Sequence, residues 1–345
     1  MSRDVGRTGT GTPVTESRIS LPGGMQATVL DYGAILRDLQ VPVAGGGLRR
    51  VVLGYRDIQG YLEDQANVGA IVGRHGNRIG AGRLVLDGRR YQLGLNENGR
   101  QHLHGGFRRF SRKPWRLLEP GGDQVALALT SPEGEEGYPG RLDATCRFGL
   151  LPPATLRLEL TATTDAPTIV NLVHHGYFTL VPGRDVRSQL LQINASRYTP
   201  TDAELIPTGA IEPVAGTPYD FRKLRPIADG NNAAGFIYDR NFVLDRAGDG
   251  LAFAARLMAP DRSLAMEIWT SEPGLQFYDG GYLRPAQPGF DGLSLSPHAG
   301  LCLEPGKFPD GPNHPNFPSP VLRPGETYRQ VSEFRFAVPA GRTPY

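Results

Sequence analysis

The stretch LRLELTAT, residues 156–163, decides the fold class of this chain. Its apolar side chains occupy every second position, at Leu156, Leu158, Leu160 and Ala162. A period of two places apolar residues on one face of an extended strand and polar residues on the other. The stretch therefore predicts a β-strand with one buried face.

The same alternation recurs along the chain, in VALAL (125–129), SLAMEIWT (263–270) and EFRFAV (333–338). In RLVLDGRRYQL (83–93), the pair Asp87-Gly88 separates two such runs. A two-residue type I′ turn needs a positive φ at both central positions, so Asp-Gly between strands predicts a β-hairpin. No amphipathic helical pattern extends beyond about three turns. The sequence therefore predicts an all-β protein.

Length and composition agree with one large β domain. The chain has 345 residues, and a single all-β sandwich domain can contain ~250 residues or more. Residues 1–15 are polar and rich in Gly and Thr, which predicts a flexible N-terminal tail ahead of a single domain over residues 16–345. The segment 305–325 contains seven prolines and predicts a long irregular loop.

Charge and cysteine content exclude several classes of partner. The chain has 37 basic and 35 acidic residues, so its net charge of +2 creates no global field for nucleic acid or an anionic membrane. Cys146 and Cys302 are too few for a disulfide framework and lie in no CxxC motif, which predicts two buried thiols. No stretch approaches the ~18 apolar residues of a transmembrane helix, and no apolar leader opens the chain. A cytoplasmic location is therefore expected.

Histidine is rare, with seven residues, and two of these are adjacent in VNLVHHGYFTL (170–180). On a strand, His174 and His175 must point to opposite sides, so at most one of them faces any given pocket. An isolated histidine is more often a hydrogen-bonded interior residue than a catalyst. His102, His174 and His298 are interpreted in that way.

Two carboxylates stand in apolar surroundings. Glu304 ends an apolar run in GLCLEPG (300–306), and a carboxylate that would otherwise enter a core needs a partner or a function. Asp239 has a similar setting in FIYDRNFVL (236–244), where a turn Asp that caps backbone amides is the alternative interpretation. Taken singly, each carboxylate is better explained by a structural role.

Taken together, several segments carry a resemblance that no single residue does. They are GRHGNRIG (73–80), LHGG (103–106), SPEGEEGYPG (131–140), VNLVHHGYF (170–178), RYTPTDAELIPTG (197–209), YDRNFVL (238–244), EPGLQFY (272–278) and LCLEPGKFPDGPNHPNFPSPVLRPGETY (301–328). In order and spacing the chain resembles the aldose 1-epimerase (galactose mutarotase) family, from about residue 20 to 338. The resemblance implies a single large antiparallel β-supersandwich, no metal or organic cofactor, and an aldose bound in an open cleft.

Position by position, the resemblance implies a general base at Glu304, a general acid at His175 and a second active-site histidine at His104. It implies sugar contacts at Asn77, Arg78, Asp239 and Gln276. His174 falls where the family usually has Asn. The chain departs from the common pattern at His75-Gly76, Arg240, Asp279 and Pro305-Gly306.

Anomer interconversion requires these residue types for chemical reasons. A base removes the proton of the C1 hydroxyl while an acid protonates the ring oxygen, and the steps reverse after the aldehyde turns. Glu304 is expected to start ionised and His175 protonated, while His104 and Arg78 donate hydrogen bonds to the sugar. The expected partner is a small aldose of the glucose/galactose class, with no cofactor, metal, nucleic acid or membrane. The expected protein is a monomer or homodimer.

A metal-dependent enzyme of the cupin kind is one alternative. In HLHGG (102–106), His102 and His104 would share one face of an extended segment, and an H-x-H pair on a β protein can bind one metal with a later His and Glu304. The glutamate expected a few residues after the pair is missing. A non-catalytic sugar-binding module is another alternative, but it would need no Glu-His pair.

A hexose-6-phosphate 1-epimerase on the same scaffold is a further alternative. FRRFSRKPW (107–115) places Arg108, Arg109, Arg112 and Lys113 directly after the LHGG turn, and guanidinium groups suit phosphate. A solvated basic loop is the simpler interpretation. Nine residues are also too few for an extended platform that stacks single-stranded nucleic acid.

Overall fold

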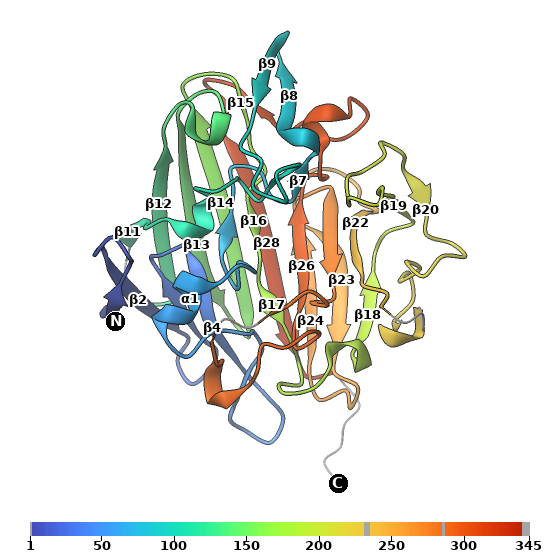
Figure 1. Ribbon diagram of the computed structural model, residues 1–345. Coiled ribbons are helices and arrows are strands. Elements are labelled where there is room, and N and C mark those ends of the chain that lie inside the picture. The colour runs from blue at the N-terminus through green and yellow to red at the C-terminus, as the bar shows by residue number, and fades with distance from the viewer. Residues whose placement is uncertain (1, 120, 231–234, 285–286, 340–345) are drawn as a thin grey trace.

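The alternating strands pair into two large antiparallel sheets in the computed structural model of the chain, which describes residues 2–119, 121–230, 235–284 and 287–339 (Figure 1). In spatial order the nine-stranded sheet comprises β11 (Arg116–Glu119), β12 (Gln124–Ser131), β13 (Leu142–Leu151), β14 (Thr155–Thr164), β28 (Tyr328–Ala337), β24 (Ala265–Thr270), β23 (Ala252–Met258), β18 (Leu190–Ile193) and β21 (Arg225–Pro226). The six-stranded sheet comprises β17 (Tyr177–Phe178), β26 (Leu301–Gly306), β25 (Gly274–Tyr278), β22 (Asp239–Val243), β19 (Arg197–Thr199) and β20 (Glu212–Pro213). The predicted all-β sandwich is confirmed.

Smaller sheets complete the strand set. The N-terminal sheet comprises β1 (Ser2–Arg7), β2 (Pro13–Ser20), β3 (Gln26–Leu30), β4 (Ile35–Pro42) and β5 (Leu48–Arg50). The two-stranded pairs are β6 (Ile71–Val72) with β16 (Val173–His174), β7 (Arg78–Ile79) with β10 (His102–Leu103), β8 (Arg83–Leu86) with β9 (Arg89–Gln92), and β15 (Thr168–Ile169) with β27 (Val321–Leu322).

Helices are short. The α-helix of the described chain is α1 (Ile58–Glu63), and the 3-10 helices are η1 (Gly80–Gly82), η2 (Phe110–Arg112), η3 (Glu135–Gly137), η4 (Val186–Ser188), η5 (Ala228–Gly230), η6 (Phe290–Gly292) and η7 (Gly311–Asn313). Within the described ranges, no helix has the length and apolar character needed to cross a membrane.

Strand β14 behaves as its alternation predicts. Leu156, Leu158 and Leu160 are almost completely buried, and they belong to the core that lies between the sheets. The strand pairs along its length with β13 on one side and with β28 on the other, so its apolar face is continued by both neighbours. The predicted hairpin is confirmed as well, because Asp87 and Gly88 have φ values of 50° and 76° between β8 and β9.

The expected flexible tail over residues 1–15 is wrong for the described residues, which exclude residue 1. Strand β1 pairs with β2, from Ser2 opposite Ser17 to Arg7 opposite Pro13. The side chain of Val14 is buried in a cluster with apolar residues of later segments. One buried valine among polar neighbours gives no clear periodic signal, since the apolar partners that order it come from elsewhere in the chain.

His174 packs where the two large sheets meet. Its ring contacts Phe148, Phe178 and Phe334 edge-on at centroid distances of 5.9, 6.3 and 6.1 Å, respectively. Phe178 of the six-stranded sheet stacks on Phe334 of the nine-stranded sheet, with centroids 5.0 Å apart. Neither ring nitrogen of His174 has a hydrogen-bond partner in the described chain. His174 is therefore an interior residue, as predicted, although without the expected hydrogen bond.

Burial of His174 makes stability depend on pH. Burial lowers the pKa of His174 to about 3, whereas a histidine in the unfolded chain titrates near 6.5. Below pH ~6.5 the unfolded chain binds a proton that the folded protein rejects, so the stability present above that pH is lost progressively toward pH ~3. We expect His174→Leu to weaken this decline in denaturant titrations between pH 7 and 4.

His75 also has its pKa lowered to about 3 by burial and remains in both proteins, so some pH dependence should persist in the variant. Parallel stability curves for wild type and His174→Leu would contradict the assignment.

Candidate active site

The chain places His175 beside Glu304 by pairing β17 with β26. In this antiparallel ladder Tyr177 lies opposite Cys302. His175 is two residues before Tyr177 and Glu304 is two residues after Cys302, so the same register brings His175 and Glu304 together. The backbone of His175 is held from the other side, because its N–H donates to the Ala70 carbonyl and its carbonyl accepts from the N–H of Gly69. Since neighbouring side chains alternate along an extended segment, His175 points away from the core that His174 enters.

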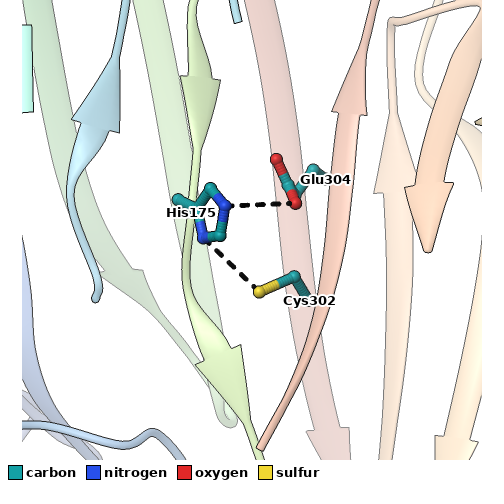
Figure 2. Close-up of side chains that lie close together, drawn as sticks. All are labelled: His175, Cys302 and Glu304. Atoms are coloured by element: carbon teal, nitrogen blue, oxygen red, sulfur yellow. Dashed lines mark hydrogen bonds and ion pairs between the residues drawn. The ribbon is translucent and has the colours of Figure 1, made fainter. Parts of the chain in front are cut away.

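His175 and Glu304 face each other across a short gap (Figure 2). Nε2 of His175 lies 3.8 Å from Oε1 of Glu304, and Nδ1 of His175 lies 3.5 Å from Sγ of Cys302. The three side chains are buried. The arrangement leaves one ring nitrogen of His175 directed toward the carboxylate and the other engaged by the thiol.

A cavity of about 460 Å³ opens onto this pair. Six of the seven predicted site residues line it, namely Asn77, Arg78, His104, His175, Asp239 and Glu304. The seventh, Gln276, does not line the cavity and instead donates a hydrogen bond from its side chain to Oδ1 of Asp239. Gln276 lies opposite Glu304 in the ladder of β25 and β26, so the two side chains share one face of the sheet, and Asp239 links Gln276 to the cavity.

His104 is oriented by the LHGG turn. Its Nδ1 accepts a hydrogen bond from the backbone N–H of Asn77 at 3.1 Å, so the neutral ring carries its proton on Nε2. Its ring contacts that of His175 edge-on with centroids 5.1 Å apart. The turn requires glycine at residue 105, where φ is +88° and a Cβ atom would lie 1.7 Å from the Gly73 carbonyl oxygen.

Arg78 is held in place by a carboxylate that sequence reasoning missed. Its Nε and Nη2 donate to the two oxygens of Glu97 at 2.8 and 2.6 Å, and its Nη1 lies 3.7 Å from Oδ2 of Asp239. A bidentate pair of this kind fixes the plane of the guanidinium group. Nothing in the local pattern NENGR, residues 96–100, distinguishes Glu97 from a carboxylate on a surface turn.

Burial opposes charge on both members of the central pair. It raises the pKa of the Glu304 carboxyl well above its usual range, and nearby Asp239 adds to this effect. It lowers the pKa of His175 to about 4, with a further contribution from Arg109. Burial therefore disfavours the expected starting state, ionised Glu304 with protonated His175, relative to the neutral pair.

The cavity wall includes residues that sequence reasoning did not select as site residues: Asn67, Arg109, Tyr177, Tyr278, Tyr282 and Arg284. Tyr177 and Tyr278 could have been found from strand alternation beside Glu304 and His175. Arg109 belongs to the basic loop that was interpreted as solvated, and this interpretation is wrong for it, since Arg109 is only 8% exposed. Arg108, by contrast, is exposed.

The metal alternative fails on the position of His102. Its Nδ1 lies 2.7 Å from the Gly94 carbonyl oxygen and its Nε2 lies 2.6 Å from the Tyr138 hydroxyl, outside the cavity. His102 is thus a hydrogen-bonded interior residue, as predicted. His298 is hydrogen-bonded as well, with its Nδ1 3.1 Å from the Asp279 carbonyl oxygen, but it is only partly buried. His104 has a φ of +52°, so the segment is not extended and the H-x-H pair does not converge.

His175, Cys302 and Glu304 have ligand atoms within 4.8 Å of one another, which is close enough to consider a metal ion. However, the Cys302 thiol faces Nδ1 of His175 and the Glu304 carboxylate faces Nε2. One metal ion can bind only one of these two ring nitrogens. Burial also raises the pKa of the Cys302 thiol well above its usual value, which opposes the thiolate that a metal requires. The geometry favours acid–base chemistry over metal ligation.

Comparison with known proteins shows the family of the chain. A sequence profile of the family described as Aldose 1-epimerase matches residues 17–335. The chain belongs to the aldose 1-epimerase family. It is 37% identical to the Aldose 1-epimerase of Escherichia coli (strain K12) over 326 residues, which cover 91% of this chain and 92% of that protein. It is also 37% identical to the Galactose mutarotase of Rattus norvegicus over 321 residues, with the same coverage.

Solved structures place this aldose 1-epimerase family member in the same fold. A homologue of the family from C. elegans superposes with a TM-score of 0.88 at 28% identity, covering 94% of this chain and 98% of that one. The galactose 1-epimerase of Lactobacillus acidophilus superposes with a TM-score of 0.82 at 26% identity, covering 98% of each chain. The predicted family, fold and isomerase class are confirmed.

Metal removal tests the acid–base interpretation of the site. Because Cys302 and Glu304 engage different nitrogens of His175, we expect dialysis of the purified protein against EDTA to leave its rate of anomer interconversion unchanged. The measurement is polarimetry before and after dialysis. Loss of activity that a divalent metal restores would contradict this interpretation.

Proposed function

We propose that this family member interconverts the α and β anomers of a free aldose of the glucose/galactose class, with Glu304 as general base and His175 as general acid. One observation carries the proposal: Glu304 and His175 are buried and line the same cavity, with Oε1 of Glu304 3.8 Å from Nε2 of His175. One carboxylate and one imidazole meet the needs of ring opening, in which one proton leaves O1 and another reaches the ring oxygen.

Ring opening would proceed in a balanced pair of proton transfers. The Glu304 carboxylate takes the proton of the C1 hydroxyl, the bond from C1 to the ring oxygen breaks, and His175 donates its proton from Nε2 to that oxygen. Rotation about the C1–C2 bond presents the other face of the aldehyde. The C5 hydroxyl then attacks C1, His175 recovers its proton, and Glu304 returns the proton to O1.

Burial supports these roles through the pKa directions. A raised pKa makes the Glu304 carboxylate a stronger base, and a lowered pKa makes the His175 imidazolium a stronger acid. Ring opening converts a carboxylate and an imidazolium into a carboxylic acid and a neutral imidazole. The cavity therefore disfavours the charged reactant pair but favours the forms that the proton transfers produce.

The remaining polar residues would bind and orient the sugar. His104 presents an N–H at Nε2 toward the cavity, and Arg78 presents the guanidinium edge that lies nearer to Asp239. Asn77 and Asp239 line the same cavity and offer further hydrogen-bonding groups for hydroxyls. Gln276 acts through Asp239, which its side chain holds.

The non-catalytic module is disfavoured by the buried acid–base pair, which sugar binding alone does not require. The hexose-6-phosphate alternative gains support from one observation, the presence of Arg109 in the cavity wall. A cytoplasmic location, a monomer or homodimer, and the absence of nucleic-acid partners remain predictions.

Substitution of the pair tests the assigned roles. Glu304→Gln keeps shape but deletes basicity, so kcat should fall at least ~10²-fold, and His175→Asn should cost a comparable factor. The double variant should lose far less than the product of the two, because both residues serve one coupled proton transfer. The measurement is saturation-exchange NMR of the anomers, with folding checked by circular dichroism.

His174→Asn is the matched control. The His174 ring points into the core, so this substitution should affect kcat only mildly. Near wild-type interconversion by Glu304→Gln, or an essential His174 beside a dispensable His175, would overturn the roles.

The pH dependence of activity follows from the proton count of Glu304 and His175. The active form of this pair carries one proton in total. Below the lowered pKa of His175, about 4, both groups are protonated and no base remains. Above the raised pKa of Glu304 both groups are deprotonated and no acid remains. We expect a bell-shaped profile of kcat/KM with its acid limb near pH 4, and residual activity of His175→Asn without that limb. An acid limb that persists unchanged in His175→Asn would contradict this assignment.

A further inference from the structure

Arg109 is a buried cation in the cavity wall whose side chain has no partner among the residues that the structure describes. The residue is 8% exposed, and its Nε is buried with no hydrogen-bond acceptor in the described chain. No hydrogen bond or ion pair joins its guanidinium group to another residue of the described chain. Burial lowers its pKa to about 10, with Arg112 adding repulsion. Leaving a buried charge unpaired is costly, so a group that is absent from the free protein is implied.

Another buried arginine shows what a purely structural role looks like in this chain. Arg74, 1% exposed, donates from Nε, Nη1 and Nη2 to the hydroxyl of Ser131 and to backbone carbonyls, including those of Pro139 and Gly140. All three of its nitrogens are satisfied by the protein. Arg109 has a similar degree of burial and lacks such acceptors.

The carboxylates near Arg109 are already engaged. Asp64, the acidic group that stabilises its charge at a distance, accepts hydrogen bonds from the Tyr55 hydroxyl and from the N–H groups of Ala66 and Val68. Of the two acidic residues that line the cavity, Asp239 lies beside Arg78 and Glu304 faces His175. The cavity therefore contains a cation that its own carboxylates do not neutralise.

The loop that carries Arg109 is fixed in a direction that separates it from its neighbour. The Glu136 carboxylate accepts hydrogen bonds from the backbone N–H groups of Phe107 and Arg108 at 3.0 and 2.9 Å. Phe110, which follows Arg109, is buried and contacts Trp115 edge-on at 5.9 Å. Anchored on both sides, the chain directs Arg109 into the cavity while Arg108 remains exposed.

Arg109 lines the same cavity as His175, the residue assigned to protonate the ring oxygen. Its charge lowers the pKa values of both His104 and His175, the two histidines of the site. In a hexopyranose the carbon that bears the ring oxygen also bears C6. A group attached at C6 would therefore lie beside the acid that serves the ring oxygen, in the cavity that Arg109 also lines.

We propose that the preferred substrate is an aldose that carries an anionic group at C6, which Arg109 binds through its guanidinium. This inference rests on the proposed function and specifies its substrate class. A carboxylate, as in a hexuronate, and a phosphate ester share the required chemistry, since both accept paired hydrogen bonds from arginine. Arg284, which also lines the cavity, adds a second cation on its exposed side.

The test compares glucose, glucuronate and glucose 6-phosphate as substrates, each corrected for its spontaneous rate. Wild-type kcat/KM should be higher for at least one anionic sugar than for glucose. In Arg109→Gln the ratio of the anionic to the neutral value should fall about 10- to 100-fold, the range for hydrogen bonds to a charged group. Arg108→Gln, the exposed neighbour, should leave the ratio unchanged. The carboxylate and phosphate arms identify which anion is preferred.

Equilibrium binding to Glu304→Gln gives an independent measurement when Arg109→Gln folds poorly. Calorimetric titration with glucuronate and with glucose should show tighter binding of the anion, and Arg109→Lys, which keeps a charge, should retain part of the kinetic preference. A wild-type enzyme that prefers glucose to both anionic sugars would overturn the inference while leaving the proposed function intact. Failure to accelerate interconversion of any sugar would instead overturn the proposed function.

Discussion

The antiparallel ladder between β17 and β26 is the constraint on which the site depends. It sets Tyr177 opposite Cys302, and from that register His175 and Glu304 meet across the gap between neighbouring strands. A slip of one residue would reverse every side chain on the shifted strand. His174 would then lose its place among the phenylalanines, so the same register secures both the packing of the core and the alignment of the proposed acid–base pair.

Much of the fold could be predicted from local periodicity. The alternation in residues 156–163 requires one buried face, and Asp87-Gly88 has the backbone freedom that a two-residue hairpin demands. The opposite directions of His174 and His175 also follow from strand geometry alone. These predictions are correct because the features depend only on residues that are close in sequence.

The rest depends on partners distant in sequence. The side chain of Glu97 meets Arg78 only because the turn after β9 folds back, and no spacing rule connects the two. Arg109 precedes a single turn of 3-10 helix, where no period tells inward from outward. The protonation states of Glu304 and His175 could not be predicted for a related reason. A sequence shows a carboxylate and an imidazole, but it does not show the water that folding removes from them.

The thiol of Cys302 gives the floor of the site an intrinsic reporter. Burial raises the pKa values of both cysteines, Cys302 beside His175 and Cys146 within the core, so each thiol is protected in the closed protein. A thiol reagent can modify them only when the chain opens locally or unfolds. Cys146 lies on β13, which is paired on both sides within the nine-stranded sheet, so its exposure requires opening of that sheet. The difference between their labelling rates would therefore separate local opening beside His175 from opening of the nine-stranded sheet.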